Sequence, residues 1–249
     1  MEKFEDKNAK NDEKMLKNRN FFHKLSNFIN KYICPDNFKC IFCGADIADF
    51  SHKPYCSSCE KILPFNCGKC CKICAESINN EQEICDFCQR EKRSFKKLFA
   101  PFRYEGIVKK SVLEFKHESK KYLAKGFAII LCEMIKDIRF DYITYIPKTD
   151  EKIYNHSKTL AEEISKLLNV PCVKMFSKVK ATKPQKSLPA AERTENVKDA
   201  FLINFVATNK TILLVDDVAT TCATLEACAS KSKGNCVYAV VIARNNLPI

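Results

Sequence analysis

Two adjacent carboxylates stand where an apolar segment gives way to a turn of small and hydroxyl side chains. The segment 212–215 is entirely apolar, Asp216 and Asp217 follow it, and three threonines lie between 220 and 224. Neighbouring side chains on an extended chain point in different directions, so this pair can accept hydrogen bonds from two sugar hydroxyls or lie beside a hydrated Mg²⁺. The N–H groups and hydroxyls of the turn can surround a phosphate where a helix begins. The alternative is that Asp217 only caps that helix and the threonines are ordinary turn residues.

A second chemical pattern is a set of four Cys-x-x-Cys pairs in the first third of the chain. The pairs are separated by twelve residues in the first half of the set and by ten in the second. Each pair places two sulfurs on one tight turn, which is the arrangement that tetrahedral zinc–thiolate sites use. The pattern predicts two structural zinc sites, with the ligands Cys40, Cys43, Cys56, Cys59, Cys71, Cys74, Cys85 and Cys88. A redox motif is disfavoured because the surrounding βαβ pattern is missing.

The spacing leaves the pairing of these cysteines open. Cys67 and Cys70 form a fifth pair, and Cys70 adjoins Cys71, so the register of the second site can shift by one residue. The two halves can each bind one metal, or the first pair can join the third. His52 could replace a sulfur, although a solvated loop histidine is the better interpretation. Zinc is expected to supply most of the folding free energy of so short a segment.

Behind these motifs lies a pattern of alternating strands and helices. From about residue 99 onward, short β-rich segments alternate with helical periodicity, which is typical of a parallel sheet covered on both faces. The fold class predicted is therefore α/β, with ligands bound beyond the carboxyl ends of the strands. Strands are expected at 98–104, 142–146, around 173, at 211–215 and at 236–243, with helices at 120–138, 156–168 and between the last two strands.

Composition and charge limit the class of protein and its partners. The chain has 249 residues, a formal net charge of +12 and 16 cysteines, and its first 20 residues lack the apolar core of a secretion signal. Thiolate zinc sites in a reducing cytoplasm explain the cysteines better than disulfides do. We expect a disordered or helical basic tail over 1–33, a zinc-ribbon module over 34–92 and the α/β domain over 93–249. The apolar stretches are too short to span a membrane.

Several separated motifs resemble one family in the same order. Residues 214–224 resemble the phosphoribosyl-pyrophosphate (PRPP) signature of type I phosphoribosyltransferases. The chain from Cys40 onward resembles the ComF (GntX-like) family of competence proteins, which pair a double zinc ribbon with a phosphoribosyltransferase domain. The further matches are the leading cysteine pairs, Tyr104-Glu105-Gly106, Phe115-Lys116, Ile146-Pro147, Asn155, and the segment from Lys180 through Gln185, Leu188, Arg193 and Asn196 to Phe201.

This resemblance implies roles for particular residues. Asp216 and Asp217 would contact the ribose hydroxyls of PRPP and its Mg²⁺, the loop with Lys148 would face the pyrophosphate, and 180–196 would form a flap over the site. The catalytic residues implied are Asp216, Asp217 and Lys148. The PRPP-binding residues implied are Asp216, Asp217, Ala219, Thr220, Thr221, Cys222, Ala223, Thr224, Lys180, Gln185 and Arg193.

Two departures from the family pattern affect the expected activity. Lysines replace the arginine-rich stretch of the pyrophosphate loop, and a lysine cannot clamp an anion bidentately. Cys222 stands where glycine is usual in the phosphate loop. The resemblance therefore implies either a phosphoribosyltransferase linked to DNA uptake and competence, or a weakly active adaptor that binds single-stranded DNA or DNA-processing partners. The segment 90–125, with twelve Lys or Arg against four Glu, is the candidate nucleic-acid surface, unless its aromatic residues face the core.

Overall fold

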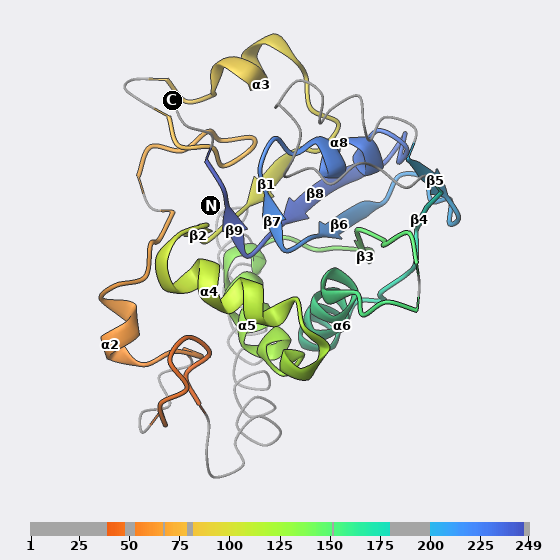
Figure 1. Ribbon diagram of the computed structural model, residues 1–249. Helices are drawn as coiled ribbons and strands as arrows, with labels where there is room; N and C mark the ends of the chain where they lie inside the picture. Colours follow the sequence, from red (N-terminus) through yellow and green to blue (C-terminus); the bar gives the residue numbers. More distant parts are fainter. Residues whose placement is uncertain are drawn as a thin grey trace, which may run out of the picture.

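A parallel sheet forms the centre of the molecule. The computed structural model describes residues 39–47, 53–66, 68–78, 82–150, 152–179 and 200–246 (Figure 1). Its four-stranded sheet has the order β1-β8-β6-β3, and every neighbouring pair is parallel. The strands are β1 (Lys97–Phe99), β8 (Cys236–Val240), β6 (Thr211–Val215) and β3 (Tyr142–Tyr145). The predicted α/β class with a parallel sheet is confirmed.

Three of these strands break and then pair again. A second parallel sheet has the order β2-β9-β7, and its strands are β2 (Phe102–Arg103), β9 (Ala243–Arg244) and β7 (Val218–Ala219). The break between β6 and β7 consists of Asp216 and Asp217. The Asp216 N–H donates to Val240 O at 3.1 Å, and the Ile242 N–H donates to Asp217 O at 2.9 Å. The backbone of the acidic pair is therefore held within the sheet where the main strands end.

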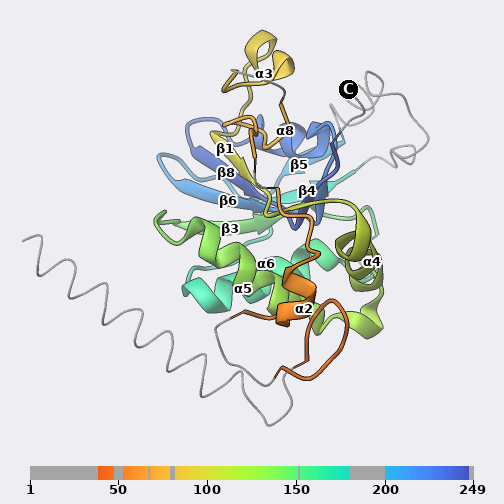
Figure 2. The same cartoon turned by 90° about the vertical axis from the view of Figure 1, so that its left-hand side faces the viewer.

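Helices cover both faces of the sheet. Figures 1 and 2 place three helices on one face and a shorter one on the other. The first three are α4 (Gly106–Phe115), α5 (Leu123–Ile135) and α6 (His156–Leu168), and the fourth is α8 (Ala223–Ala229). Leu213 and Val215 of β6 belong to the apolar cluster on the first face, and Ile212 and Leu214 to the cluster on the second. This alternation is the two-residue period of a strand buried on both sides.

Local sequence sets the ends of α6. The Asn155 side chain accepts a hydrogen bond from the Lys158 N–H at 3.2 Å and caps the helix, and Asn169 ends it in the left-handed conformation. Leu160 and Ile164 are fully buried on its inner face. The predicted helix at 156–168 and the predicted strand at 211–215 have the observed bounds.

Other elements differ from the sequence-based expectation. The strand expected over 98–104 is divided into β1 and β2, and α4 lies where the pattern predicts no helix. Near Val173 the chain makes only one bridge, between Cys172 and Ile143. The next strand, β4 (Phe176–Lys178), pairs antiparallel with β5 (Phe201–Ile203), outside the main sheet. The helix expected over 120–138 is shorter, with a 3-10 turn at Glu118–Lys120 before it.

The cysteine-rich segment packs on both faces of the sheet. Cys40, Ile41 and Cys59 belong to the apolar cluster that contains α5, whereas Cys71 and Cys74 belong to the cluster that contains α8. Two short helices, α2 (Ser57–Glu60) and α3 (Asp86–Arg90), lie in the two halves of the segment and on opposite sides of the sheet in Figure 2. The segment therefore shares both cores with the α/β domain.

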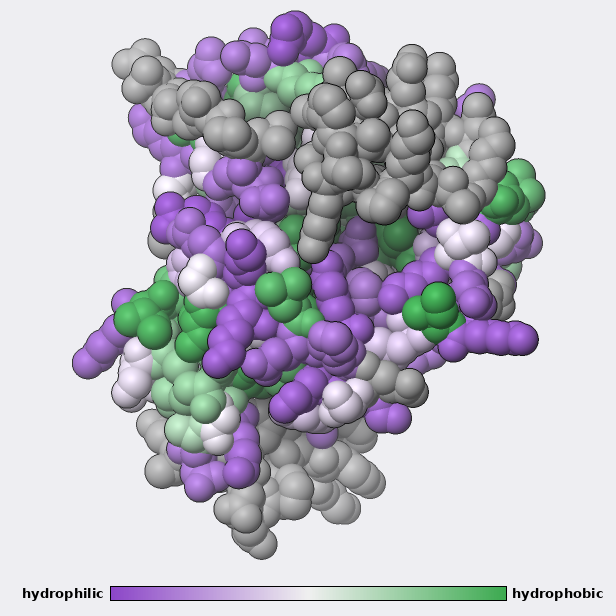
Figure 3. Space-filling model, viewed as in Figure 1, coloured by the Kyte–Doolittle hydropathy of each residue, from purple (hydrophilic) through white to green (hydrophobic). Residues whose placement is uncertain are grey.

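The outer surface carries only scattered apolar side chains. On the face shown in Figure 3, hydrophilic side chains predominate and hydrophobic ones appear as separate patches. Exposed residues such as Ile62 and Leu202 are of this kind, and single exposed apolar side chains are ordinary on a protein surface. Within the described ranges, no helix has the length and apolar character needed to cross a membrane.

Candidate functional site

Asp217 is a buried carboxylate with a lysine and a histidine beside it. It is 6% exposed, and its Oδ2 lies 2.7 Å from Lys116 Nζ and 3.4 Å from His156 Nε2. Its Oδ1 accepts the Val218 N–H at 2.8 Å. Lys116 is the C-cap of α4 and His156 is the first residue of α6, so two helices on one face of the sheet place basic side chains beside the break between β6 and β7.

Asp216 has a different environment. Its Oδ1 accepts hydrogen bonds from the Ser157 hydroxyl at 2.8 Å and from the Asp217 N–H at 2.9 Å. Its Oδ2 makes no hydrogen bond to any residue in the part of the chain that the structure describes. This oxygen is therefore available to a ligand, whereas Asp217 Oδ1 accepts a hydrogen bond and the buried Asp217 Oδ2 has only its contacts with Lys116 and His156 among the described residues.

The two carboxyl groups have opposite pKa shifts. Burial and the charge of Asp217 raise the pKa of Asp216 to about 7, against the bonds from Ser157 and the Asp217 N–H. Burial alone would also raise the pKa of Asp217, but the hydrogen bond from His156 and the charge of Lys116 hold it well below its usual range. Asp217 therefore carries a stable negative charge, whereas the protonation of Asp216 depends on the groups around it.

Further polar groups surround this pair. Lys148 Nζ donates to Tyr154 O at 2.6 Å, and desolvation lowers the pKa of Lys148 although Asp217 acts in the opposite direction. Burial raises the pKa of Tyr104, which lies within electrostatic range of Lys116 and Asp217. Three motifs that are far apart in the sequence therefore meet at the end of β6. Sequence reasoning assigned no role to Lys116 and His156. The signals that could have found them are the Phe115-Lys116 match to the family and the place of His156 at the start of a predicted helix.

The turn 219–224, which follows the acidic pair, is held in part by a hydrogen bond within the turn. Cys222 has a φ of 63° and is 3% exposed, so a side chain with a Cβ occupies the left-handed conformation. The Ala223 N–H donates to the Thr221 Oγ1 at 3.3 Å. Ala219 and Ala223 are buried, and Thr220 and Thr224 are partly exposed. The hydroxyl-bearing residues thus remain at the surface of the turn.

Part of the implied site lies outside the described residues. Lys180, Gln185 and Arg193 of the expected flap fall in this group, as do Cys67, His52 and the tail 1–33. The antiparallel strands β4 and β5 stand on either side of the flap segment in the sequence. Their pairing brings the two ends of that segment together.

The eight predicted zinc ligands form two groups of four sulfurs. Within each group the sulfur atoms lie within 4.8 Å of one another, and the groups are Cys40, Cys43, Cys56 and Cys59, and Cys71, Cys74, Cys85 and Cys88. The sequential pairing is therefore the observed one. Cys70 is not a member, and its Sγ contacts Asn66 Oδ1 at 3.3 Å instead. Four thiolates at this spacing could hold one tetrahedral zinc ion per group.

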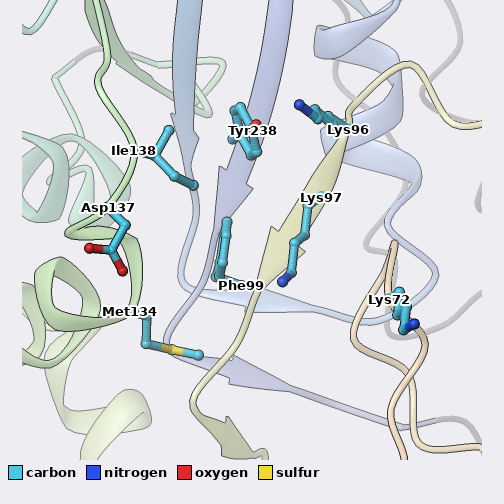
Figure 4. A pocket seen from close by; sticks show the side chains of 8 residues that line it. All are labelled: Lys72, Lys96, Lys97, Phe99, Met134, Asp137, Ile138 and Tyr238. Atoms are coloured by element: carbon cyan, nitrogen blue, oxygen red, sulfur yellow. The ribbon is translucent and has the colours of Figure 1, made fainter. Parts of the chain in front are cut away.

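One cavity lies apart from the acidic pair. It has a volume of about 360 Å³ and opens between β1, β8 and the C-terminal end of α5 (Figure 4). Its lining consists of Lys72, Lys96, Lys97, Phe99, Met134, Asp137, Ile138 and Tyr238. The cavity is therefore basic and partly aromatic, and none of the residues implied for PRPP binding lines it.

These features define an α/β protein with a parallel sheet, an acidic pair at the strand ends and two four-cysteine groups on opposite faces. Over 208 residues, the chain is 24% identical to "Competence protein F" of Haemophilus influenzae, in a match that covers 76% of this chain and 88% of that protein. No family model matches the chain. The resemblance to the ComF family expected from the sequence is confirmed by this relative together with the two cysteine groups.

Solved structures align with about half of the chain. A purine phosphoribosyltransferase from Pyrococcus horikoshii is 16% identical, with a TM-score of 0.31, and the alignment covers 51% of this chain and 92% of that one. UMP synthase from Leishmania donovani is 18% identical, with a TM-score of 0.33, and the alignment covers 49% of this chain and 22% of that one. The fold assignment rests on the strand order and pairing described above.

Proposed function

We propose that this chain is a ComF-like protein of the phosphoribosyltransferase type that binds PRPP or another ribose 5-phosphate ligand with Mg²⁺. The observation that carries the proposal is the acidic pair at the end of β6, between Lys116, His156 and Lys148. An anionic sugar phosphate needs hydrogen-bond acceptors for its hydroxyls and positive charge for its phosphates. Both kinds of group meet at this edge of the sheet, where α/β proteins bind ligands.

Two polar atoms at this edge are available to the ligand. Asp216 Oδ2 has no hydrogen bond within the described residues, and neither has the buried His156 Nδ1. A buried polar atom without a partner, such as His156 Nδ1, is costly, and a bound ribose can supply hydroxyl groups to it and to Asp216 Oδ2. We propose that Asp216 accepts hydrogen bonds from the ribose hydroxyls. Asp217, held by its ion pair with Lys116, would keep the neighbouring side chains in place.

The donor set also fits a hydrated Mg²⁺. A carboxylate with one unoccupied oxygen is the kind of group that holds this ion through water or directly, with phosphate oxygens as the remaining ligands. When bound, the ion would neutralise the phosphates of PRPP. The turn 219–224 is assigned to the 5-phosphate and the flap residues Lys180, Gln185 and Arg193 to the bound ligand, as the family resemblance implies.

The activity that such a site supports is glycosyl transfer from PRPP. The bond between C1 of the ribose and the pyrophosphate oxygen would break, and pyrophosphate would leave with the electron pair. Positive charge would develop on the sugar, and C1 would form a new bond to a nucleophilic atom of the acceptor. Lys148 and Lys116 would stabilise the departing pyrophosphate, while the packed helix ends limit water. Lysines act as point charges here, so we expect slower turnover than an arginine clamp would give.

Calorimetric titration with PRPP, with and without Mg²⁺, tests this proposal. We expect Mg²⁺-dependent binding to the wild-type protein and no binding to the double variant Asp216→Asn, Asp217→Asn. Glu133→Gln is the matched control, because this acid lies exposed on α5 and pairs only with Lys136 at the surface, among the described residues. Equal affinity in the double variant would remove the ligand from this site, and pyrophosphate release on adding PRPP would separate turnover from binding.

The biological setting is proposed from the relative and the cysteines. The name of the Haemophilus protein supports a role in competence and DNA uptake. Zinc-bound thiolates persist in a reducing compartment, which supports the cytoplasm as the location. We retain 1–33 as a tail, 34–92 as a zinc-ribbon module and 93–249 as the phosphoribosyltransferase-like domain.

A second candidate function is the binding of single-stranded DNA, and the basic cavity favours it. Lys96 Nζ lies 5.3 Å from the centre of the Tyr238 ring, and Lys97 Nζ lies 4.7 Å from that of Phe99. Figure 4 shows these lysines along one side of the cavity, with Lys72 beyond them. Phe99 is buried, whereas Tyr238 is half-buried, so Tyr238 is the ring on which a base could stack while the lysines hold phosphates. Outside the cavity, three aromatic residues of the basic segment are buried in the core and offer no such surface, namely Phe95, Phe102 and Phe115.

The salt dependence of DNA binding locates this contact. Changing Lys72, Lys96 and Lys97 to Gln should lower the salt slope by up to about 0.7 for each phosphate that the protein no longer binds. The matched set changes Lys109, Lys110, Lys120 and Lys121, which are also surface lysines of the basic segment. A lower slope only in the second set would move the DNA to α4 and the following turn. No binding even at low salt would remove this candidate.

A further inference from the structure

The second cysteine group is packed against the turn that follows the acidic pair. Cys71, Cys74 and Cys88 share one apolar cluster with Cys222 and Ala223. In Figure 1 the second half of the cysteine segment, with α3, lies over α8, the helix that begins at this turn. The candidate metal ligands and the candidate phosphate loop are therefore neighbours in one core.

Two arginines connect them. Arg93, three residues after α3, donates from Nη2 to Thr221 O at 3.2 Å, and it lies within electrostatic range of Cys88 and Cys74. Its guanidinium carbon also lies 4.1 Å from the centre of the ring of Phe87, the residue before Cys88. One side chain therefore connects the segment that carries the candidate zinc ligands with the backbone of the loop.

Arg244 approaches the same place from β9. Its side chain is 3% exposed, it forms an ion pair with Glu76, and it lies within electrostatic range of Cys74 and Cys222. Its Nε and Nη1 have no hydrogen-bond partner within the described residues. Asn245, the next residue, donates its N–H to Ala219 O at 2.8 Å, so the chain that carries Arg244 also holds the start of the turn.

The negative charge of a zinc–thiolate group would account for the two arginines near the second cysteine group. A zinc ion with four thiolates is doubly negative, and a buried net charge is costly unless opposite charge lies beside it. Arg93 and Arg244 supply that charge. Without metal, Arg244 is a buried cation and Arg93 a half-buried one, and among the described residues only Glu76 forms a carboxylate ion pair with either of them. Near the first group, by contrast, Lys53 pairs with Glu60 at the protein surface.

We propose that Arg93 and Arg244 are positioning residues that couple metal loading of the second cysteine group to the conformation of the loop 219–224. Loss of this metal frees the arginines, and the loop then loses its bond at Thr221. Metal at the first group, on the opposite face of the sheet, does not act on the loop. The coupling itself concerns the loop, and its effect on ligand affinity rests on the function proposed above.

Amide hydrogen exchange of the full-length zinc-loaded protein tests the coupling. Arg93→Ala should raise exchange in the peptide 219–226 by about tenfold or more, because it removes a charge-assisted bond. It should also speed zinc release to a chelator from one of the two groups. Exchange in β3 should not change. Arg103→Ala is the matched control, since that arginine is exposed and pairs with Glu105.

Removing individual metals provides the second arm. Cys85→Ser should raise exchange in the same peptide, whereas Cys56→Ser should leave it unchanged. If either variant fails to fold, chelator titration of the wild type replaces it, with zinc release and loop exchange followed together. Loop exchange that is unchanged after Arg93→Ala, or unchanged when the second metal leaves, overturns the coupling.

PRPP titration separates the two proposals. Loop exchange that follows the metal in a protein without PRPP affinity would refute the proposed function and leave the coupling intact. PRPP affinity that survives both Arg93→Ala and loss of the second metal would refute the effect of coupling on the ligand. A fall in affinity of about tenfold, in step with loop exchange, is the expected result.

Discussion

The ion pair between Lys116 and Asp217 offers the sharpest test of how the site is held together. Lys116→Met keeps much of the length and apolar volume of the side chain but removes its charge. Asp217 would then keep His156, at 3.4 Å, as its only basic side chain in direct contact among the described residues. Breaking a buried ion pair from one side leaves an uncompensated charge, and this is the source of the expected loss of stability.

The size of the expected stability loss depends on how deeply the Lys116–Asp217 ion pair is buried. Removing one partner of a fully buried pair costs about 3–5 kcal/mol. The Lys116 side chain is 33% exposed, and Asp217 keeps its hydrogen bond from Val218. We therefore expect a smaller loss in the free energy of unfolding, of about 2–3 kcal/mol. The double variant Lys116→Met, Asp217→Asn should recover part of it, because no buried charge is left without a partner.

Urea unfolding at pH 7 in the presence of zinc measures these free energies. Lys109→Met is the control, because that lysine lies exposed on the same helix, and its loss should stay within about 0.5 kcal/mol. A loss below about 0.5 kcal/mol for Lys116→Met would refute the reasoning. So would simple additivity of the Lys116 and Asp217 changes, since residues in contact should couple.

The remaining predictions concern three other positions. Asp216 has a raised pKa, so its protonated form stabilises the fold at low pH, and this contribution is lost as the pH rises from about 4 to about 7; Asp216→Asn should remove that slope from urea unfolding measured at several pH values. In Gly126→Ala the new Cβ would lie within 2.5 Å of Ile41 Cγ2, and the overpacking should cost about 1–3 kcal/mol, more than the higher helix propensity of alanine returns. Zinc loss from the first group should become faster, and adding Ile41→Ala should remove the clash and this effect. Cys222→Gly should leave thermal stability within about 1 kcal/mol because it relieves the positive φ, whereas Cys222→Val should cost about 2 kcal/mol or more, and equal effects of the two would contradict the strain argument.

The two cysteine groups stabilise different parts of the molecule. The first group anchors the segment to α5, where Gly126 has no side chain and Ile41 fits against the helix. The second lies in the core beside Cys222 and near two arginines. Because zinc binding carries much of the folding free energy of such segments, a metal ion bound at each group would stabilise a different face of the same sheet.

Local sequence pattern by itself determined several elements of this protein. The apolar run 212–215 has the composition of a central parallel strand buried on both faces, and the spacing of Leu160 and Ile164 defined α6 with its Asn155 cap. Cys-x-x-Cys spacing likewise defined which sulfurs lie close together within each pair. These features depend on residues near one another in the sequence, so periodicity and caps were sufficient to predict them.

The tertiary structure decided which residues and elements contact one another. Which cysteine pairs join, and that the resulting groups lie on opposite faces of the sheet, depends on packing against α5 and α8. The partners of Asp217 come from two distant parts of the chain, since Lys116 ends a helix that the pattern did not predict and His156 begins another. A hydrophobic pattern shows that a side chain is buried but not against which neighbour, because contact partners are set by the topology of the whole chain.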